Sequence, residues 1–165
     1  MTKFNKKTAV LLAVFVVLCM FVFVSCEDKN QNKALTGTAT IVVGEKEYSI
    51  DLAEAQMYSN NTVFDAIEYL AQKDANDSTK AEADKFTYTG TISSYGAFVS
   101  TISGITFADR QYIALFVSDI QYKDTSAYCL DNKTINGTIY YYSGVGVSSI
   151  KLADGLKVLF IAESY

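Results

Sequence analysis

The sequence TISSYGAFVSTISGITFADRQYIALFVSD, residues Thr91–Asp119, decides the fold of this chain. It holds two strand-like runs, Ala97–Ile102 and Tyr112–Val117, joined by a connector that begins with the turn dipeptide Ser103-Gly104. The second run is apolar at every position, so both of its pleat faces should be covered by other parts of the protein. We therefore expect Tyr112–Val117 in the middle of a sheet.

Alternation of apolar and polar residues predicts a β-hairpin on the N-terminal side of this stretch. Residues Thr38–Val43 alternate, Gly44–Lys46 turns the chain, and residues 47–52 alternate again. Each of the two runs therefore has one apolar face, and the hairpin should bury that face against the rest of the domain.

Further strands are predicted on both sides of the central run. The alternating run 86–92 is expected to direct its apolar residues to one face; these are Phe86, Tyr88 and Ile92. The dipeptide Asn136-Gly137 favours a hairpin turn, and the strand Thr138–Tyr142 follows it. A loop of small residues, Gly144–Ser149, then leads toward the last apolar run, Leu156–Ile161.

One principal helix is predicted to begin at Thr62, which with Asp65 has the form of a capping box. Apolar residues then recur at helical spacing and make one stripe that should pack across the sheet; they are Val63, Phe64, Ile67, Leu70 and Ala71. The charged segment Lys73–Lys85 has no apparent buried face, which predicts a solvated loop or a weak continuation of the helix. These patterns together predict an α+β domain with about seven strands and one principal helix.

The N-terminal residues 1–25 read as a secretory signal. Three lysines precede the uninterrupted apolar run Ala9–Val24, which is shorter than the roughly 20 residues that span a bilayer. Cys26 follows Val24-Ser25 directly, and this ending resembles the lipobox of bacterial lipoproteins, although Phe23 stands where leucine is more common. The resemblance implies that the Cys26 thiol carries a diacylglyceryl group and begins the mature chain. An uncleaved membrane anchor is the alternative.

Cleavage before Cys26 would leave a mature chain on the extracytoplasmic face of the cell membrane, held there by its lipid. Removing three lysines lowers the formal net charge from −4 to −7, so an interaction with nucleic acid is not expected. Residues 27–33 are polar with nothing to bury, so residues 26–36 are predicted to form a flexible tether, and residues 37–165 are predicted to form the folded domain. Cys129 is expected to be a small core residue instead of a nucleophile.

Composition argues against an enzyme. Histidine, tryptophan and proline are absent from the 165 residues, and Arg110 is the only arginine. The usual general base and the commonest metal ligand are therefore missing, and we find neither paired carboxylates nor an activated nucleophile. Four acidic residues lack the spacing of a calcium loop; they are Asp74, Asp77, Glu82 and Asp84.

Four segments in order are similar to the transcobalamin C-terminal-like domain, a β-grasp-like family; they are Thr62–Ala66, Tyr95–Gly104, Tyr112–Val117 and Val147–Gly155. The match extends from Ala39 to Ala162. It implies a β-grasp-like fold that binds without catalysing. The chain departs from the family at Tyr112-Ile113, where Tyr-Trp is common, at Val117–Asp119, where Val-Asn-Gly is common, and at Leu156, where aspartate is common.

The resemblance places a candidate ligand site beside the central strand. The residues it implies are Tyr95, Gly96, Tyr112, Ser148 and Ser149. Tyrosine rings would offer apolar area and hydroxyls, and the serines would offer hydrogen bonds. No required cofactor is expected; the ligand would be a corrinoid of the cobalamin type or another small molecule. The alternative is a structural or adhesion protein of the envelope that binds a protein partner through an exposed sheet face.

Overall fold

The computed structural model describes residues 32–105 and 108–164 of the chain. Residues Asn32–Tyr165 form one compact unit. The predicted signal segment 1–25 and Cys26 lie outside the described residues, as does the first half of the predicted tether. Within the described ranges, no helix is both long and apolar enough to cross a membrane.

The fold is α+β, as predicted, and its described part contains eight strands, one α-helix and two short 3₁₀ helices. In chain order they are β1 Thr38–Val43, β2 Lys46–Asp51, α2 Val63–Asn76, η1 Glu82–Asp84, β3 Tyr88–Ser93, β4 Gly96–Ile102, β5 Gln111–Val117, η2 Ile120–Tyr122, β6 Lys133–Ile135, β7 Thr138–Tyr142 and β8 Lys157–Ser164. The strand that the sequence did not predict is β6. It has only three residues, too few to show an alternating pattern.

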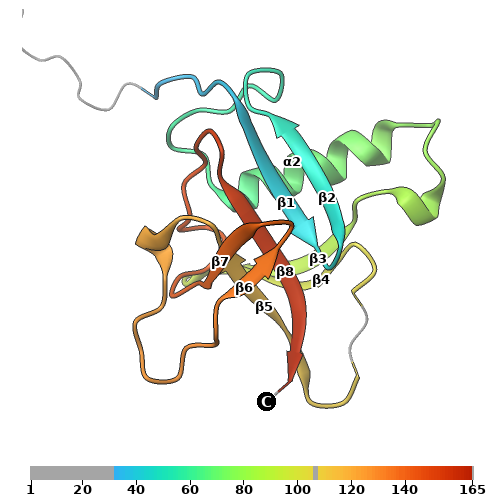
Figure 1. Ribbon diagram of the computed structural model, residues 1–165. Coiled ribbons are helices and arrows are strands. Elements are labelled where there is room, and N and C mark those ends of the chain that lie inside the picture. Colours follow the sequence, from blue (N-terminus) through green and yellow to red (C-terminus); the bar gives the residue numbers. More distant parts are fainter. Residues whose placement is uncertain (1–31, 106–107, 165) are drawn as a thin grey trace, which may run out of the picture. The chain divides into compact units, whose positions relative to one another are not determined.

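Six strands form one sheet in the order β2-β1-β8-β5-β7-β6, and β3 with β4 forms a separate two-stranded ribbon. The pair β1 and β8 is parallel, whereas the other pairs are antiparallel. Figure 1 shows β8 running through the middle of the sheet, with α2 lying behind the β1–β2 hairpin.

Strand β5 lies inside the sheet, as its sequence predicted. It pairs with β8 along its whole length, from Gln111 to Val117, and with β7 at Phe116 and Val117. One pleat face, including Ile113, packs against the main core, and the other, including Ala114, packs into a second cluster. The second cluster of buried residues consists of Val42, Ala114, Phe116, Tyr140 and Leu159.

Helix α2 covers the main core, and the capping box that the sequence predicted is present. The Asp65 carboxylate accepts hydrogen bonds from the Thr62 N–H at 2.6 Å and from the Thr62 hydroxyl at 2.8 Å. The fully buried helix residues are Val63, Ala66, Ile67 and Leu70. Phe64 is half-buried and meets the Tyr88 ring edge-on at 6.0 Å.

The turn that joins β6 to β7 has the predicted geometry. Asn136 and Gly137 have φ values of +49° and +75°, and two positive φ values in a two-residue loop match the right-handed twist of a hairpin. The strand that follows buries Tyr140, which is 1% exposed. Cys129, expected in the core, is only half-buried.

The prediction that Ile92 shares a buried face with Phe86 is wrong, because Ile92 is 73% exposed. The register of the ribbon shifts after Thr89, so that Gly90 opposes Val99 and Ser100 has no partner in the ladder. One extra residue in one strand is a β-bulge, and because it lies in β4 it lets Val99 and Ile102, three residues apart, both be buried. The alternation of β3 itself is not interrupted. Ile92 lies in residues 89–93 of β3, which are exposed on both pleat faces.

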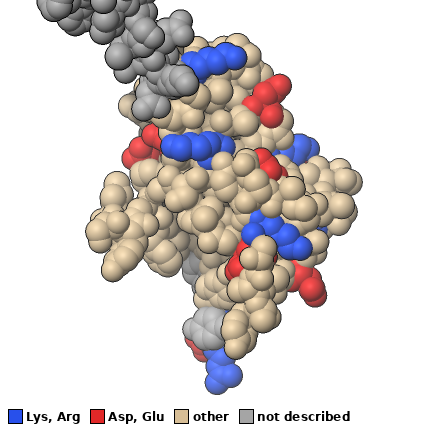
Figure 2. All heavy atoms as spheres, turned by 90° about the vertical axis from the view of Figure 1, so that its left-hand side faces the viewer, with Lys and Arg blue, Asp and Glu red and all other residues tan. Residues whose placement is uncertain are grey.

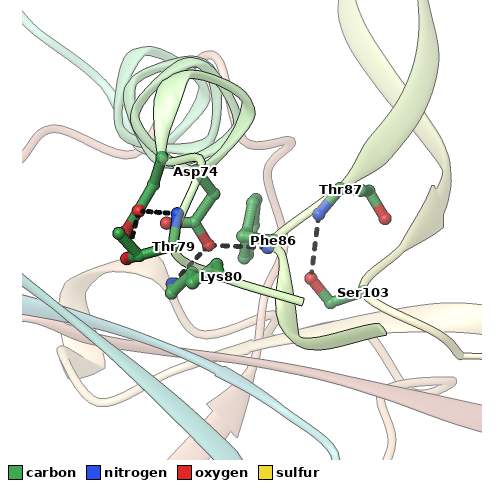
Figure 3. Close-up of polar contacts among 7 residues, drawn as sticks. Asp74, Thr79, Lys80, Phe86, Thr87 and Ser103 are labelled. Carbon is green, nitrogen blue, oxygen red and sulfur yellow. Dashed lines mark hydrogen bonds and ion pairs between the residues drawn. The ribbon is translucent and has the colours of Figure 1, made fainter. Parts of the chain in front are cut away.

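The first residues of the charged segment Lys73–Lys85 continue α2 as far as Asn76, which was one of the two alternatives. The prediction that this segment has no buried face is wrong at Asp74, which is 4% exposed. Its Oδ2 accepts hydrogen bonds from the Phe86 N–H at 2.7 Å and from the Lys80 Nζ at 2.6 Å. Figure 3 shows the Asp74 carboxylate reaching from the end of α2 to the Phe86 backbone and Lys80. Burial raises the pKa of the Asp74 carboxyl, but these partners outweigh burial and hold it below its usual value.

The same segment positions the ribbon that follows it. Asp77 accepts hydrogen bonds from the Thr79 N–H and hydroxyl at 2.8 and 2.6 Å, which turns the chain after α2. Beyond Phe86, the Ser103 N–H donates to the Thr87 carbonyl at 2.7 Å. The entry of β3 and the exit of β4 are therefore both held close to the helix end.

Candidate functional site

A cavity of about 210 Å³ opens where the β3–β4 ribbon, β5 and the loop after β7 meet. Its lining residues are Ala97, Phe98, Val99, Tyr112, Ile113, Leu115, Tyr142, Ser143, Val145, Gly146, Val147 and Phe160. None of these side chains is charged. We call this hollow the ribbon cavity.

The floor of the ribbon cavity belongs to the sheet. Ile113 and Leu115 come from the pleat face of β5 that packs on the main core, and Phe160 is fully buried on the neighbouring β8. These apolar side chains are fixed by the β5–β8 ladder, in which Leu115 opposes Phe160. The floor therefore lies on two strands that pair along the whole length of β5, and a preorganised binding site requires such support.

The far wall is the loop 143–149, which local hydrogen bonds hold in place. The Ser143 hydroxyl donates to the Val145 carbonyl at 2.8 Å, and the Gly144 N–H donates to the Tyr122 carbonyl at 2.9 Å. Val147, 4% exposed, accepts a hydrogen bond at its carbonyl from the Phe64 N–H at 3.2 Å. The start of α2 therefore supports the wall directly.

The ribbon contacts this wall through Ser148. The Ala97 N–H donates to the Ser148 Oγ at 2.8 Å. Gly96 has φ +104°, and a Cβ at this position would lie 3.2 Å from the same Oγ. Glycine is therefore required at position 96 both by backbone conformation and by the close approach of the loop.

Tyr112 lines the ribbon cavity at its β5 side and is half-buried. Burial raises the pKa of the Tyr112 hydroxyl, and the neighbouring Tyr142 hydroxyl and Glu163 carboxylate raise that pKa further. Tyr112 is therefore a neutral phenol at physiological pH. The Tyr142 ring, also in the lining, meets Phe116 edge-on at 5.4 Å.

Of the five expected site residues, Tyr112 lines the ribbon cavity. Gly96 and Ser148 contact each other and are outside the lining, although each is next in sequence to a lining residue, Ala97 and Val147. Ser149 is exposed next to Ser148 and is absent from the lining. Tyr95 is 99% exposed in the turn between β3 and β4 and also lies outside the lining.

Sequence reasoning missed Phe98 and Val145, which line the ribbon cavity and are 69% and 40% exposed. Phe98 belonged to the predicted strand-like run Ala97–Ile102, for which the sequence analysis assigned no buried face. Val145 was part of a loop that the sequence showed only as small residues. Gly144 and Gly146 beside it were the one local signal of a close approach.

Acidic and basic side chains are interspersed among uncharged residues on the face that Figure 2 shows. Among the described residues, no group of three or more His, Cys, Asp and Glu side chains is arranged to hold a metal ion.

A second, wider hollow of about 400 Å³ lies between α2 and residues 82–88, and the ion pair of Lys85 with Glu82, at 2.6 Å, borders it.

No protein-family model matches this chain, and no curated protein sequence is significantly similar to it.

Proposed function

We propose that this protein is a lipid-anchored, extracytoplasmic binding module without enzymatic activity, and that the ribbon cavity is its binding site. The observation that carries the proposal is a concave apolar surface, lined without charge and bordered by the exposed side chains of Phe98 and Val145. Apolar pockets with a few placed polar groups are typical of ligand sites. Here the polar groups are the hydroxyls of Tyr112, Tyr142 and Ser143.

The chemistry of the lining selects an uncharged occupant. A charged group would lose its water on entering and would meet no opposite charge there. The volume of about 210 Å³ is below the 300–1,000 Å³ or so of pockets for drug-sized ligands. The ribbon cavity would therefore hold one ring or one aliphatic group, and a corrinoid would enter it with only part of its structure.

A β-grasp-like fold is consistent with this proposal. An N-terminal hairpin, β1–β2, leads into one helix that packs on the sheet, and the first strand lies parallel to the last. These features support the family resemblance that the four sequence segments indicate. We propose β-grasp-like as the finer description of the α+β fold.

The anchoring part of the proposal depends on Cys26. The change Cys26→Ser should abolish incorporation of a fatty-acid analogue in growing cells and release the protein from the membrane fraction. Cys19→Ser, within the apolar run, and Cys129→Ser are the matched controls and should be labelled normally. Label retained on the Cys26→Ser protein would contradict lipid anchoring.

The binding part is tested by calorimetric titration of the full-length protein, in detergent micelles, with cobalamin and with cobinamide. If a corrinoid enters the ribbon cavity, Val145→Glu should weaken its binding at least about tenfold, which is 1.4 kcal/mol. Ile139→Glu is the control, because Ile139 is 50% exposed on β7 and outside the lining. No heat at about 1 mM ligand would end the corrinoid hypothesis.

Binding of a protein partner is the second candidate function, and the surface of the ribbon favours it. Three large apolar side chains are exposed there: Ile92 at 73%, Tyr95 at 99% and Phe98 at 69%. Phe98 pairs with Thr91 and Ile92 pairs with Ala97, so these two side chains lie on opposite faces of the ribbon. Exposed aromatic and aliphatic groups are typical of interaction sites. An envelope protein that binds a neighbour would use the end of the ribbon near its turn.

A further inference from the structure

The outer edge of strand β3 is unpaired. Among the described strands, β3 pairs with β4 alone, because the ribbon is separate from the six-stranded sheet. Residues 89–93 of β3 are all exposed, so the rest of the described chain leaves this edge uncovered. An edge strand of this kind presents unpaired N–H and C=O groups to which another strand can be added.

The ladder shows which backbone groups face outward. In an antiparallel sheet, successive residues direct their N–H and C=O groups to alternate sides. The Ser103 N–H donates to the Thr87 carbonyl at 2.7 Å, so Thr87 directs its backbone groups to the β4 side. Tyr88, Gly90 and Ile92 therefore direct theirs to the open edge. Within the described part of the chain, no partner reaches the backbone groups of these three residues from that side.

The turn end of the ribbon gives the same assignment independently. Ile92 opposes Ala97 in the ladder, and the Ala97 N–H donates away from the ribbon, to the Ser148 Oγ at 2.8 Å. Directly opposed residues of an antiparallel pair direct their backbone groups both inward or both outward. The Ile92 groups therefore face outward, and the open edge extends over three alternate residues.

The other outer strands of the described fold are protected, whereas β3 is not. Strand β2 carries Lys46, Glu47 and Asp51, and charged side chains on an edge discourage the addition of another strand. Strand β6 has only three residues and begins with Lys133. Strand β3 has the sequence YTGTIS, with neither a charge nor a proline, and residues 86–108 around it are also uncharged.

We propose that β3 pairs antiparallel with β3 of a second copy of this chain, about a two-fold axis at Gly90. In this register Tyr88 of each copy lies opposite Ile92 of the other, and the two Gly90 residues lie opposite each other. All three outward-facing residues then exchange N–H···O=C bonds with a partner. The contact uses the same surface on both copies, as a two-fold dimer requires.

The side chains are complementary in this register. Ile92, which is 73% exposed, would lie opposite Tyr88, and an aromatic ring opposite a β-branched side chain is a favourable cross-strand pair. Thr89 would lie opposite Thr91, and threonine hydroxyls in such pairs form hydrogen bonds. Gly90 leaves space at the axis for the neighbouring side chains. No like charges meet, because β3 carries none.

This inference goes beyond the proposed function and does not depend on it. The ribbon cavity is lined from β4, through Ala97, Phe98 and Val99, whereas the pairing uses the opposite edge of the ribbon. Failure of either proposal therefore leaves the other standing, because their tests use different variants and different measurements.

Disulfide crosslinking of the full-length protein in detergent micelles tests the register. Thr89→Cys and Thr91→Cys proteins, both with Cys129→Ser, are oxidised separately and as a mixture. Positions 89 and 91 of two copies would face each other with Cα atoms about 4.5 Å apart, within the reach of a disulfide. Two copies of the same position would be offset by about 6.6 Å along the strands, in addition to the distance between the strands.

The mixture should therefore give at least about tenfold more disulfide-linked dimer than either variant alone. The Cys129→Ser protein without an added cysteine gives the background from Cys19 and Cys26. Equal yields from the mixture and from the separate variants would overturn the proposed pairing.

Analytical ultracentrifugation of the same full-length protein tests the association itself. Ile92→Lys places a charge on the open edge and should weaken the dimer at least about tenfold. Tyr128→Lys is the matched control, because Tyr128 is 94% exposed in the loop before β6, and it should leave the dimer unchanged. A monomer at about 1 mM protein, or an equal effect of both variants, would overturn the proposal.

Hydrogen exchange distinguishes a second copy from any other cover on this edge. The amides of Tyr88, Gly90 and Ile92 should become protected as the protein concentration rises, whereas those of Thr89 and Thr91, which face β4, should be protected at every concentration. Protection of the first three amides that does not depend on protein concentration would show that something else covers the edge, and would overturn the proposal.

Discussion

Asp74 offers a direct test of how the helix and the ribbon are held together. The change Asp74→Asn keeps the size of the side chain and one oxygen that can accept the Phe86 N–H, but it removes the charge. The ion pair with Lys80, at 2.6 Å, is therefore lost. Asp84→Asn is the matched control, because Asp84 is exposed and lies in the same acidic segment.

The expected loss in the free energy of unfolding follows from how deeply the two side chains of this ion pair are buried. The Asp74 side chain is 6% exposed and that of Lys80 is 38% exposed, so solvent screens the pair from one side only. Hydrogen bonds to charged groups contribute about 1.5–3 kcal/mol each, and Asn retains the weaker neutral bond to Phe86. We expect Asp74→Asn to lower the free energy of unfolding by about 2 kcal/mol, and the Tm by roughly 6–10 °C.

The difference in the free energy of unfolding between wild type and Asp74→Asn should become smaller as the pH falls. The pKa of Asp74 is lowered in the folded protein, so its contribution is fully present above the unfolded value of about 3.9 and is lost as the pH falls through the folded value. Urea titrations followed by circular dichroism should therefore show a gap between wild type and Asp74→Asn at neutral pH that closes in acid. A gap that is constant down to about pH 3, or a loss equal to that of Asp84→Asn, would refute this reasoning.

Further predictions concern the packing of the helix and the contact at the cavity rim. Ile67→Ala should lower the free energy of unfolding by about 2–5 kcal/mol, because Ile67 is 0% exposed, whereas Glu68→Ala on the exposed face should change it by less than about 0.5 kcal/mol. Equal losses in a urea titration would mean that the helix is wrongly oriented. Gly96→Ala should cost about 1–3 kcal/mol, because φ is +104° and the new Cβ would lie 3.2 Å from the Ser148 Oγ. Gly146→Ala is its control, since no atom lies within 4 Å of a Cβ there, and a Gly96→Ala protein as stable as this control would show that the close approach is absent.

The elements that the sequence predicted correctly are those with a strong local pattern. Tyr112–Val117 is apolar on both faces and is indeed an inner strand with both faces covered. Thr62 and Asp65 are three residues apart, and the helix begins with them as a capping box. Asn136-Gly137 requires two positive φ values for a tight hairpin, and both are present. In each case the structure follows from a few residues that are close together in the sequence.

The elements that were missed depend on contacts between distant residues. Burial of Asp74 requires the Phe86 N–H, twelve positions later, and nothing in the charged segment indicates it. The exposure of Ile92 depends on how far the core extends beneath the ribbon, because residues 89–93 of β3 are exposed on both pleat faces. Gly90 was a signal only of the bulge in the ribbon, because a Cβ there would lie 2.5 Å from the Phe98 carbonyl oxygen, and glycine inside a strand often marks a bulge.

The candidate site depends on distant contacts as well. Of the residues that the family-like segments indicated, Tyr112 lines the ribbon cavity, whereas Gly96 and Ser148 contact each other outside the lining. The cavity lies where the chain leaves β5 after Ser143, and no residue pattern shows where two strands part. Phe98 and Val145 became candidates only when the ribbon and the loop were seen to face the same hollow.

Site-specific photo-crosslinking in living cells tests the central claim, that the ribbon cavity is the binding site, most directly. A photoreactive phenylalanine analogue would replace Val145 at the cavity rim and, in a matched strain, Ile139 on β7; both positions are exposed and only the first lines the cavity. Irradiation should yield a discrete adduct at position 145, and none at position 139. Adducts of equal yield at both positions, or an adduct at position 139 alone, would contradict the account.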